Sequence, residues 1–177
     1  VEQTLAANDL EHARLRLTVT AGTLSMLRSS QGEPAMQIRQ TVCVQSSQPT
    51  AFAPGYFEKG VRARLYGQGA NPFDITAGHK TLNYWARLRS LRQAAASDCA
   101  EAIWLSVTNH LASGAVSNLF LAKDGELFTP IARGEEKSEA LPAPVLPGIT
   151  REAVIETAQT QGITVRKQML SIDDLLD

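Results

Sequence analysis

The N-terminal part of the chain is patterned for β-strands. Apolar residues alternate with arginine and threonine over residues 15–20, and a period of two is typical of a strand with one buried face. Apolar residues at 38–44 and 61–66 predict two more short strands, and residues 28–36 are rich in turn formers. Residues 2–7 have the pattern of a helix end. Strands therefore dominate the elements predicted for the first third of the chain.

Further along, apolar residues recur every three to four positions, after a loop predicted at 67–78. This period predicts an amphipathic helix that starts near Thr81, with Tyr84, Leu88, Leu91 and Ala95 on its apolar face. Thr150 is a favourable N-cap for a second helix, which Gly162 would end. The inward positions of the second helix are predicted to be Val154, Ile155 and Ala158.

Short strands are predicted between and after these helices. Residues 102–106 are apolar, and strands at 118–122 and 126–128 are joined by Lys-Asp-Gly, a strong hairpin signal. A long polar, proline-rich loop at 131–145 is followed by the second helix and a last strand at 163–169. Because strands and helices mix without strict β-α-β alternation, the predicted fold class is α+β.

The composition is that of an ordinary globular protein. The chain has 177 residues, of which 44% are hydrophobic and 20% charged, and its net charge is −1. There is no basic excess to attract a nucleic acid or an anionic membrane, so neither is expected as a partner. The local basic cluster of Arg87, Arg89 and Arg92 is interpreted as a solvated helix face. Cys43 and Cys99 lack metal-ligand spacing, so no metal site is expected.

The two ends suggest that the sequence is part of a longer protein. Residue 1 is valine, and the last segment begins like a capped helix, with Ser171 and Asp174 in an S-x-x-D pattern, but stops soon afterwards. No apolar run approaches the roughly 20 residues that span a bilayer, and no signal peptide opens the chain. Together with the sparse cysteines, these features predict a cytoplasmic location.

Three segments in fixed order carry the candidate chemistry. They read Gly-His-Lys-Thr-Leu-Asn-Tyr at 78–84, Ser-Gly-Ala-Val-Ser-Asn-Leu-Phe at 113–120 and Leu-Pro-Gly-Ile-Thr-Arg at 146–151, with Thr-Pro at 129–130. By itself, each segment has an ordinary explanation: a solvated lysine, a turn before a strand, or a capped helix. Together they resemble the class IV aminotransferases, which are fold-type-IV enzymes of pyridoxal 5′-phosphate (PLP). This family includes branched-chain and D-amino-acid aminotransferases and aminodeoxychorismate lyases.

The resemblance implies a fold and an assembly. Residues 15–177 would form the large PLP-binding domain, a mixed sheet or barrel with flanking helices that is truncated at its C-terminal end. Residues 1–14 would be the end of the small N-terminal domain, most of which is lacking. The family also implies a homodimer with active sites near the subunit interface, and residues 133–144 would lie in that neighbourhood. By composition alone, this loop is an ordinary mobile surface loop.

The resemblance also assigns roles at a cofactor site. Lys80 would be the Schiff-base lysine, since a side chain where a loop meets a helix start can be held toward a cleft. Burial there would lower its pKa and make it nucleophilic. Backbone N–H groups of Gly148, Ile149 and Thr150, with the Thr150 hydroxyl, would bind the phosphate at a helix N-terminus. The other cofactor-binding residues would be Ser113, Ser117, Asn118 and Leu146, and Leu146 would pack against the pyridine ring.

The sequence departs from the family pattern at two positions. Ser113 stands where the family has a glutamate that pairs with the pyridine nitrogen and keeps it protonated. A neutral hydroxyl stabilises a pyridinium less than a carboxylate does, so the ring would withdraw electrons less strongly. Ala21 stands where many relatives have an arginine, so the carboxylate-binding role of that arginine is not carried over.

The implied function is amino-group transfer between an amino acid and a 2-oxo acid, with Lys80 moving the α-proton as base and acid. Two alternatives stay open. One is a PLP-dependent elimination of the aminodeoxychorismate lyase type. The other is a non-catalytic, PLP-free relative that acts as a dimerisation or binding module. Ser113 and Ala21 favour this last alternative, whereas Lys80 and the segment at 146–150 oppose it.

Overall fold

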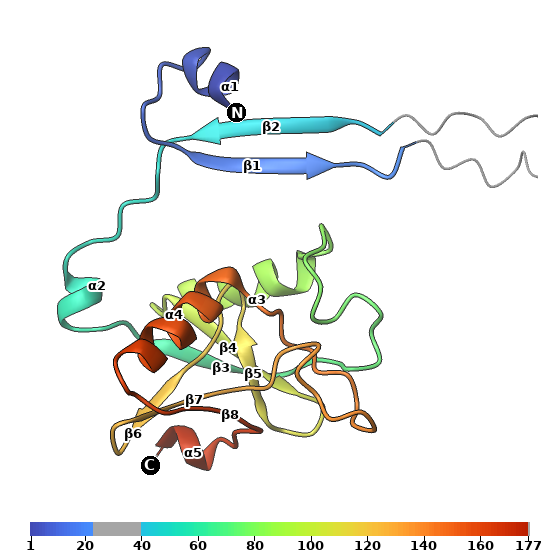
Figure 1. Cartoon of the computed structure of the whole chain (residues 1–177), viewed down its shortest axis with the longest axis vertical. Coiled ribbons are helices and arrows are strands. Elements are labelled where there is room, and N and C mark those ends of the chain that lie inside the picture. Colours follow the sequence, from blue (N-terminus) through green and yellow to red (C-terminus); the bar gives the residue numbers. More distant parts are fainter. Residues whose placement is uncertain (23–39, 177) are drawn as a thin grey trace, which may run out of the picture. The chain divides into compact units, whose positions relative to one another are not determined.

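The computed structural model describes residues 1–22 and 40–176 and divides the chain into two compact units, Val1–Glu58 and Lys59–Asp177 (Figure 1). The predicted turn-rich stretch at 28–36 and the predicted start of the second strand at Ile38 lie outside the described residues. The boundary between the two compact units falls after residue 58, because the strands of the first unit pair with each other. The domain boundary that the resemblance placed after residue 14 stays a prediction.

The first unit is built around one antiparallel pair of strands. Strand β1 (Arg14–Val19) pairs with β2 (Val42–Ser47) in a register that sets Leu17 opposite Val44. Helix α1 (Glu2–Ala6) contacts β2, and the short helix α2 (Gly55–Glu58) ends the unit. The first strand and the second from Val42 onward are therefore confirmed, whereas α2 was not predicted.

The second unit begins with a three-stranded mixed sheet. Strand β3 (Ala63–Ala70) runs parallel to β4 (Glu101–Ser106), and helix α3 (Trp85–Ala95) connects them and packs on both. Strand β5 (Leu111–Gly114) then returns antiparallel to β4. The sequence did not predict β5, and β3 extends to Ala70 into a stretch that was predicted as loop.

A second three-stranded sheet is formed by the C-terminal part of the chain. Strands β6 (Leu121–Lys123) and β7 (Glu126–Thr129) form the predicted hairpin, and Asp124 and Gly125 in its turn have φ values of 51° and 76°. Two positive φ angles suit the right-handed twist of paired strands. Helix α4 (Ile149–Thr160) then leads to β8 (Val165–Lys167), which is parallel to β7.

A short last helix, α5 (Asp173–Leu176), follows β8. The predicted cap of this helix is confirmed, because the Ser171 hydroxyl accepts a hydrogen bond from the Asp174 amide, and the Asp174 carboxylate accepts one from the Ser171 amide. Each partner thus satisfies a backbone donor of the other. With two mixed sheets and packed helices, the predicted α+β class is confirmed.

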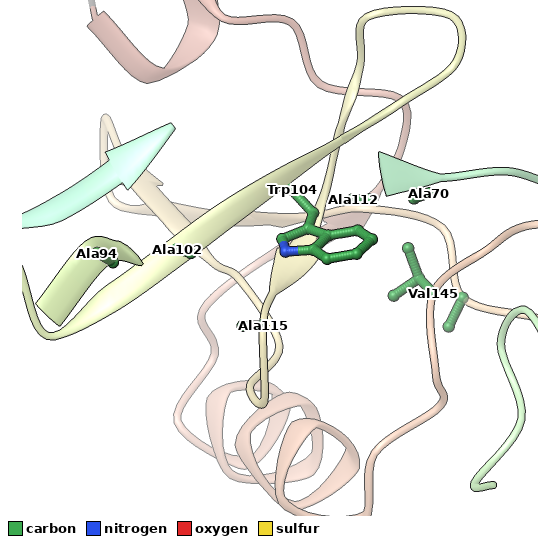
Figure 2. Close-up of a cluster of buried hydrophobic side chains, with 8 residues drawn as sticks. Ala70, Ala94, Ala102, Trp104, Ala112, Ala115 and Val145 are labelled. Atoms are coloured by element: carbon green, nitrogen blue, oxygen red, sulfur yellow. The ribbon is translucent and has the colours of Figure 1, made fainter. Parts of the chain in front are cut away.

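Strand β4 is buried on both faces and separates two hydrophobic clusters. Ala102 and Trp104 point into one cluster, and Ile103 and Leu105 point into the other, as the period of two requires. In the first cluster Trp104 is surrounded by small residues (Figure 2), namely Ala70, Ala94, Ala102, Ala112, Ala115, Ala132 and Val145. The second cluster joins β4 and β5 to Leu170 and to the partly buried Phe128 of β7.

In both long helices, the buried residues differ in part from those that the sequence predicted. Helix α3 begins at Trp85 rather than near Thr81, and Leu88 is exposed while Ser90 and Ala94 are buried. Helix α4 is capped by Gly148 and not by Thr150. It buries Arg151, Ile155 and Ala158, so Ile155 and Ala158 were predicted correctly, whereas Val154 is exposed. Gly162 has a φ of 73° just after α4, which confirms its role at the helix end.

Gly69 makes room for the buried tryptophan, because a Cβ atom there would clash with the Trp104 ring. Gly69→Ala is expected to lower the free energy of unfolding by about 1–3 kcal/mol, the usual cost of overpacking. Gly67→Ala in the same strand is the matched control, since nothing lies within 4 Å of its added Cβ. Equal urea midpoints for the two variants would contradict this account of the packing.

Candidate active site

The second unit contains a cavity of about 180 Å³ beside the first hydrophobic cluster. Its walls come from the end of β3, the loop before α3, the first turns of α3 and the turn after β5. The cavity brings together five of the predicted site residues, which are Lys80, Ser113, Ser117, Asn118 and Leu146. Gly148, Ile149 and Thr150 do not line it.

Lys80 lies in the cavity wall, in the loop that precedes α3 and before the helix start at Trp85. Its Nζ atom is 3.4 Å from the Tyr84 hydroxyl and 5.1 Å from the centre of the Tyr84 ring. The lysine side chain is exposed, so the burial expected for it is not observed in this chain. Its amine therefore has one long hydrogen bond and access to the cavity.

The loop that carries Lys80 is fixed at Gly78. This residue has a φ of 72°, and an added Cβ would come within 2.8 Å of Arg133 side-chain atoms and 2.9 Å of the Ala143 carbonyl oxygen. Arg133 also donates a hydrogen bond to the Ala77 carbonyl at 3.0 Å, and its amide donates to Val145 at 2.9 Å. The loop at 131–145 is thus packed against the lysine loop, with Ala132, Ala143 and Val145 buried, rather than being an ordinary surface loop.

A carboxylate behind the cavity holds the turn after β5. Glu101 Oε1 accepts hydrogen bonds from the amides of Ala102 and Ala115, at 2.8 and 2.9 Å, and Oε2 accepts one from Ser117 at 2.7 Å. An added Cβ at Gly114 would meet the side-chain ends of Ser117 and Glu101, so a larger residue there would displace the hydrogen bond between them. Glu101 was not predicted as a site residue. Glu101 is the first residue of β4, and nothing in the sequence indicates that it accepts hydrogen bonds from the turn after β5.

Arg87 belongs to the site, although the sequence analysis interpreted it as part of a solvated helix face. It is half-buried and lines the cavity, whereas Arg89 and Arg92 are exposed, so the interpretation as a solvated face holds only for the other two. Arg87 Nη1 donates hydrogen bonds to Ser113 Oγ at 3.0 Å and to the Gly114 carbonyl at 2.9 Å. A stripe at three- to four-residue spacing through Tyr84, Arg87, Leu91 and Ala94 was the signal that could have found it.

The segment at 146–151 is tied to the cavity by Asn118. The amide nitrogen of Asn118 donates to the Leu146 carbonyl at 2.8 Å, and its Oδ1 fills the space that a Cβ at Gly148 would need. Helix α4 starts there without a side-chain cap, so the N-capping role predicted for Thr150 is wrong. Uncapped N–H groups and the helix dipole make this helix start able to accept an anion.

A buried ion pair fixes the start of α4. The Arg151 side chain is 1% exposed and binds both carboxylate oxygens of Glu135, at 2.9 and 2.8 Å. Arg151 also donates to the Pro130 carbonyl, and Lys167 of β8 donates to Glu135 at 2.7 Å. Burial raises the pKa of Glu135, but hydrogen bonds from Arg151, Lys167 and the Ala132 amide outweigh it and bring the pKa from 4.5 down to about 2.

The sequence pattern of one protein family, amino-transferase class IV, matches residues 1–177. The chain belongs to the class IV aminotransferase family. The resemblance inferred from the three segments is thereby confirmed, and a fold-type-IV structure with it.

Three relatives show how the class IV chain compares with known members. The branched-chain-amino-acid aminotransferase of Escherichia coli is 39% identical over 120 residues, which are 67% of this chain and 36% of that protein. Its crystal structure matches with a TM-score of 0.75 and 30% identity, covering 96% of this chain and 52% of that one. A hypothetical aminotransferase of Mycobacterium tuberculosis in its PLP-bound form has a TM-score of 0.74 and 26% identity, covering 99% and 57%.

The third relative is a proposed 4-amino-4-deoxychorismate lyase of Legionella pneumophila. Its structure has a TM-score of 0.78 at 23% identity and covers 99% of this chain and 58% of that one, which shows a shared fold. This class IV chain therefore spans about half the length of the solved relatives that it matches. None of the helices in the described part of the chain is long and apolar enough to cross a membrane.

Gly78, two residues before Lys80, gives a test of how the loop that carries Lys80 is fixed. Gly78→Ala is expected to lower the free energy of unfolding by about 1–3 kcal/mol more than Gly60→Ala. Gly60 has a nearly equal φ of 70° but open space around its Cβ, so it carries the backbone strain without the clash. Chemical denaturation of both variants measures the difference, and no difference would mean that Arg133 and Ala143 do not constrain this loop.

The Arg151–Glu135 pair predicts a pH dependence of stability. At neutral pH, Glu135→Gln leaves a buried guanidinium without its counter-charge and should cost roughly 3–5 kcal/mol. Because the pKa of Glu135 is lowered on folding, its contribution is complete above about 4.5 and is lost as the pH falls toward about 2. The gap between wild type and variant should therefore shrink over that window.

A matched control for this experiment is Glu126→Gln. Glu126 forms a bidentate ion pair with Arg166 at the surface. Such surface pairs contribute about 1 kcal/mol or less to the free energy of unfolding. Equal losses in the two variants at neutral pH would contradict the special role of the buried pair. Thermal or urea unfolding measured across the pH range supplies both comparisons.

Proposed function

We propose that this chain forms the cofactor-holding part of a PLP-dependent aminotransferase that exchanges an amino group between an amino acid and a 2-oxo acid. The observation that carries the proposal is the cavity that gathers Lys80 with Ser113, Ser117, Asn118 and Leu146, in a chain whose whole length matches the class IV family. The substrate class follows that of the relatives, which include a branched-chain-amino-acid aminotransferase.

The residues of the cavity, together with the start of α4 outside its lining, supply a donor set that fits PLP. Lys80 supplies an amine, which is a group that can bond covalently to an aldehyde. This amine has one long hydrogen bond. Ser113 and Ser117 supply hydroxyl groups beside it, and Leu146 supplies an apolar wall. The uncapped start of α4 at Gly148, Ile149 and Thr150 supplies backbone donors for a phosphate. These roles are the ones that the family resemblance implies for the same residues.

PLP, when bound, would withdraw electrons from the substrate carbon that bears the amino group. The residues of this chain would then act on positions and protons. Lys80 Nζ would take and return the α-proton, and the Tyr84 hydroxyl, 3.4 Å away, would orient the amine between these transfers. Glu101 would keep the turn at 114–117 in shape, and Asn118 would hold Leu146 against the bound ring.

A lyase of the aminodeoxychorismate type is the second candidate. The observation that favours it is Ser113, a neutral group buried in the cavity wall where the family pattern has a carboxylate. The two activities differ in their products: a lyase releases pyruvate from aminodeoxychorismate, whereas an aminotransferase passes the amino group to a 2-oxo acid. Assay of both products with one enzyme preparation separates them.

A homodimer is part of the proposal. Near the cavity loop and the start of α3, large apolar side chains are exposed at Phe73, Ile75, Leu82 and Trp85. Such a group of exposed apolar residues is typical of an interaction surface. A cytoplasmic location, by contrast, stays a prediction from the sequence.

The full-length gene product incubated with PLP and then reduced with borohydride tests the cofactor and the lysine together. We expect a PLP adduct on the peptide that contains Lys80, since reduction fixes a carbon–nitrogen bond to that amine. The adduct should vanish in Lys80→Ala and persist in Lys137→Ala, which removes an exposed lysine of the same unit. A folded protein without an adduct would contradict the proposal and favour a PLP-free binding module. An adduct on another lysine would contradict the role of Lys80.

A further inference from the structure

Arg87 has a role in the cavity that the proposed function does not use. It projects from α3, and its guanidinium carbon lies 4.7 Å from the centre of the Trp104 ring. Burial lowers the pKa of Arg87, and Tyr84 and Glu101 act in the opposite direction, so the guanidinium stays charged. A permanent cation is therefore part of the cavity wall next to Ser113.

The hydrogen bonds of Arg87 all leave from one nitrogen. Nη1 donates to Ser113 Oγ at 3.0 Å, to the Gly114 carbonyl at 2.9 Å and to the Ala115 carbonyl at 3.4 Å. Neither Nε nor Nη2 has a hydrogen-bond partner among the described residues. Ser113 Oγ accepts from Arg87, and its own O–H has no acceptor in the described part of the chain. The Arg87–Ser113 pair thus leaves unused donors at the cavity.

The acidic groups near the cavity are already engaged. Glu101 accepts hydrogen bonds from Ala102, Ala115 and Ser117, and Asp74 accepts two from Thr76. Hydrogen bonds from Thr76 lower the pKa of Asp74, so this exposed carboxylate stays charged and is bound to its neighbour in sequence. The other titratable side chains that line the cavity are His79, Lys80 and Tyr84. Neither carboxylate has a hydrogen bond to Ser113 among the described residues, because both accept from other donors.

We propose that Arg87, acting through Ser113, holds the ring nitrogen of bound PLP in its unprotonated form. This inference rests on the proposed function and on the family resemblance, which implies that this nitrogen lies at Ser113. An unprotonated pyridine nitrogen is an acceptor and suits the free Ser113 O–H, whereas a pyridinium is a cation and a donor. Beside Arg87 a pyridinium would meet like charge, which disfavours the protonated ring. Arg87 is a positioning residue in this arrangement, because it acts on the ring through Ser113.

The Arg87–Ser113 pair takes the place of the glutamate that the family pattern has at position 113. Trp104 lies beside Ser113 in the register of β4 and β5, and Arg87 stacks on Trp104. The guanidinium is therefore fixed by an aromatic ring, two backbone carbonyls and Ser113 at once. A group fixed by four contacts is preorganised, so it need not move when the cofactor binds.

The test uses the full-length gene product loaded with PLP that carries nitrogen-15 in its ring, because the nitrogen-15 chemical shift reports protonation directly. We expect the wild-type protein to show the shift of an unprotonated, hydrogen-bonded pyridine. In Arg87→Met the like charge beside the ring is removed, so the shift should move toward the pyridinium range, and adding Ser113→Glu should complete that move. Arg89→Met, which changes an exposed arginine of the same helix, should leave the shift unchanged.

Ser113→Ala provides a second, conservative variant that keeps Arg87 in place. Its nitrogen should stay unprotonated but lose the hydrogen bond, which shifts the signal toward that of free, unprotonated pyridine. A pyridinium shift in the wild-type protein overturns the inference. If that result comes with weaker substrate binding in Arg87→Met, Arg87 belongs to an anionic group of the substrate instead.

The two proposals fail in different ways. If borohydride attaches PLP to Lys80 and the wild-type ring nitrogen is protonated, the proposed function stands and the role of Arg87 is wrong. If no PLP attaches to the folded protein, the proposed function fails and the inference fails with it. If PLP attaches, the nitrogen is unprotonated in wild type, and Arg87→Met but not Arg89→Met raises its protonation, both are supported.

Discussion

The buried guanidinium of Arg151 is the constraint on which the rest of the site depends. A charge that is 1% exposed must be paired, and its pairing with Glu135 joins α4 to the loop at 131–145 and, through Lys167, to β8. The same loop carries Arg133, which holds the backbone at Ala77. Contacts therefore run continuously from the inner face of α4 to the loop that carries Lys80. The start of α4 and this loop are thus not free to move independently.

The wall of the cavity follows from a second constraint, the burial of β4 on both faces. Small residues around Trp104 leave space for the indole ring (Figure 2), and the indole N–H is satisfied by Ser90 at 2.7 Å. The ring is stacked against Tyr66 on one side and lies under Arg87. A rigid aromatic wall with a fixed cation is the setting in which Ser113 replaces a carboxylate.

Much of this arrangement was predictable from the sequence, and the exceptions have a common cause. Alternation predicted β1, an apolar run predicted β4, and a turn signal predicted the β6–β7 hairpin, since these signals are local. Arg87, Glu101 and Glu135 were missed or misinterpreted, because each pairs with a group at least 14 residues away. A charged residue on a helix is ordinarily solvated, and only its tertiary partner shows otherwise. The same effect turned α4 so that Arg151, rather than Val154, faces inward.

The contrast between the two tryptophans of this chain has an optical consequence. Trp104 is 4% exposed and borders the cavity, whereas Trp85 is 76% exposed at the start of α3. Indole fluorescence shifts to longer wavelength in water and is quenched by energy transfer to a nearby absorbing ring. In the chain by itself, the emission at shorter wavelength is therefore expected from Trp104, and an absorbing group in the cavity would quench it.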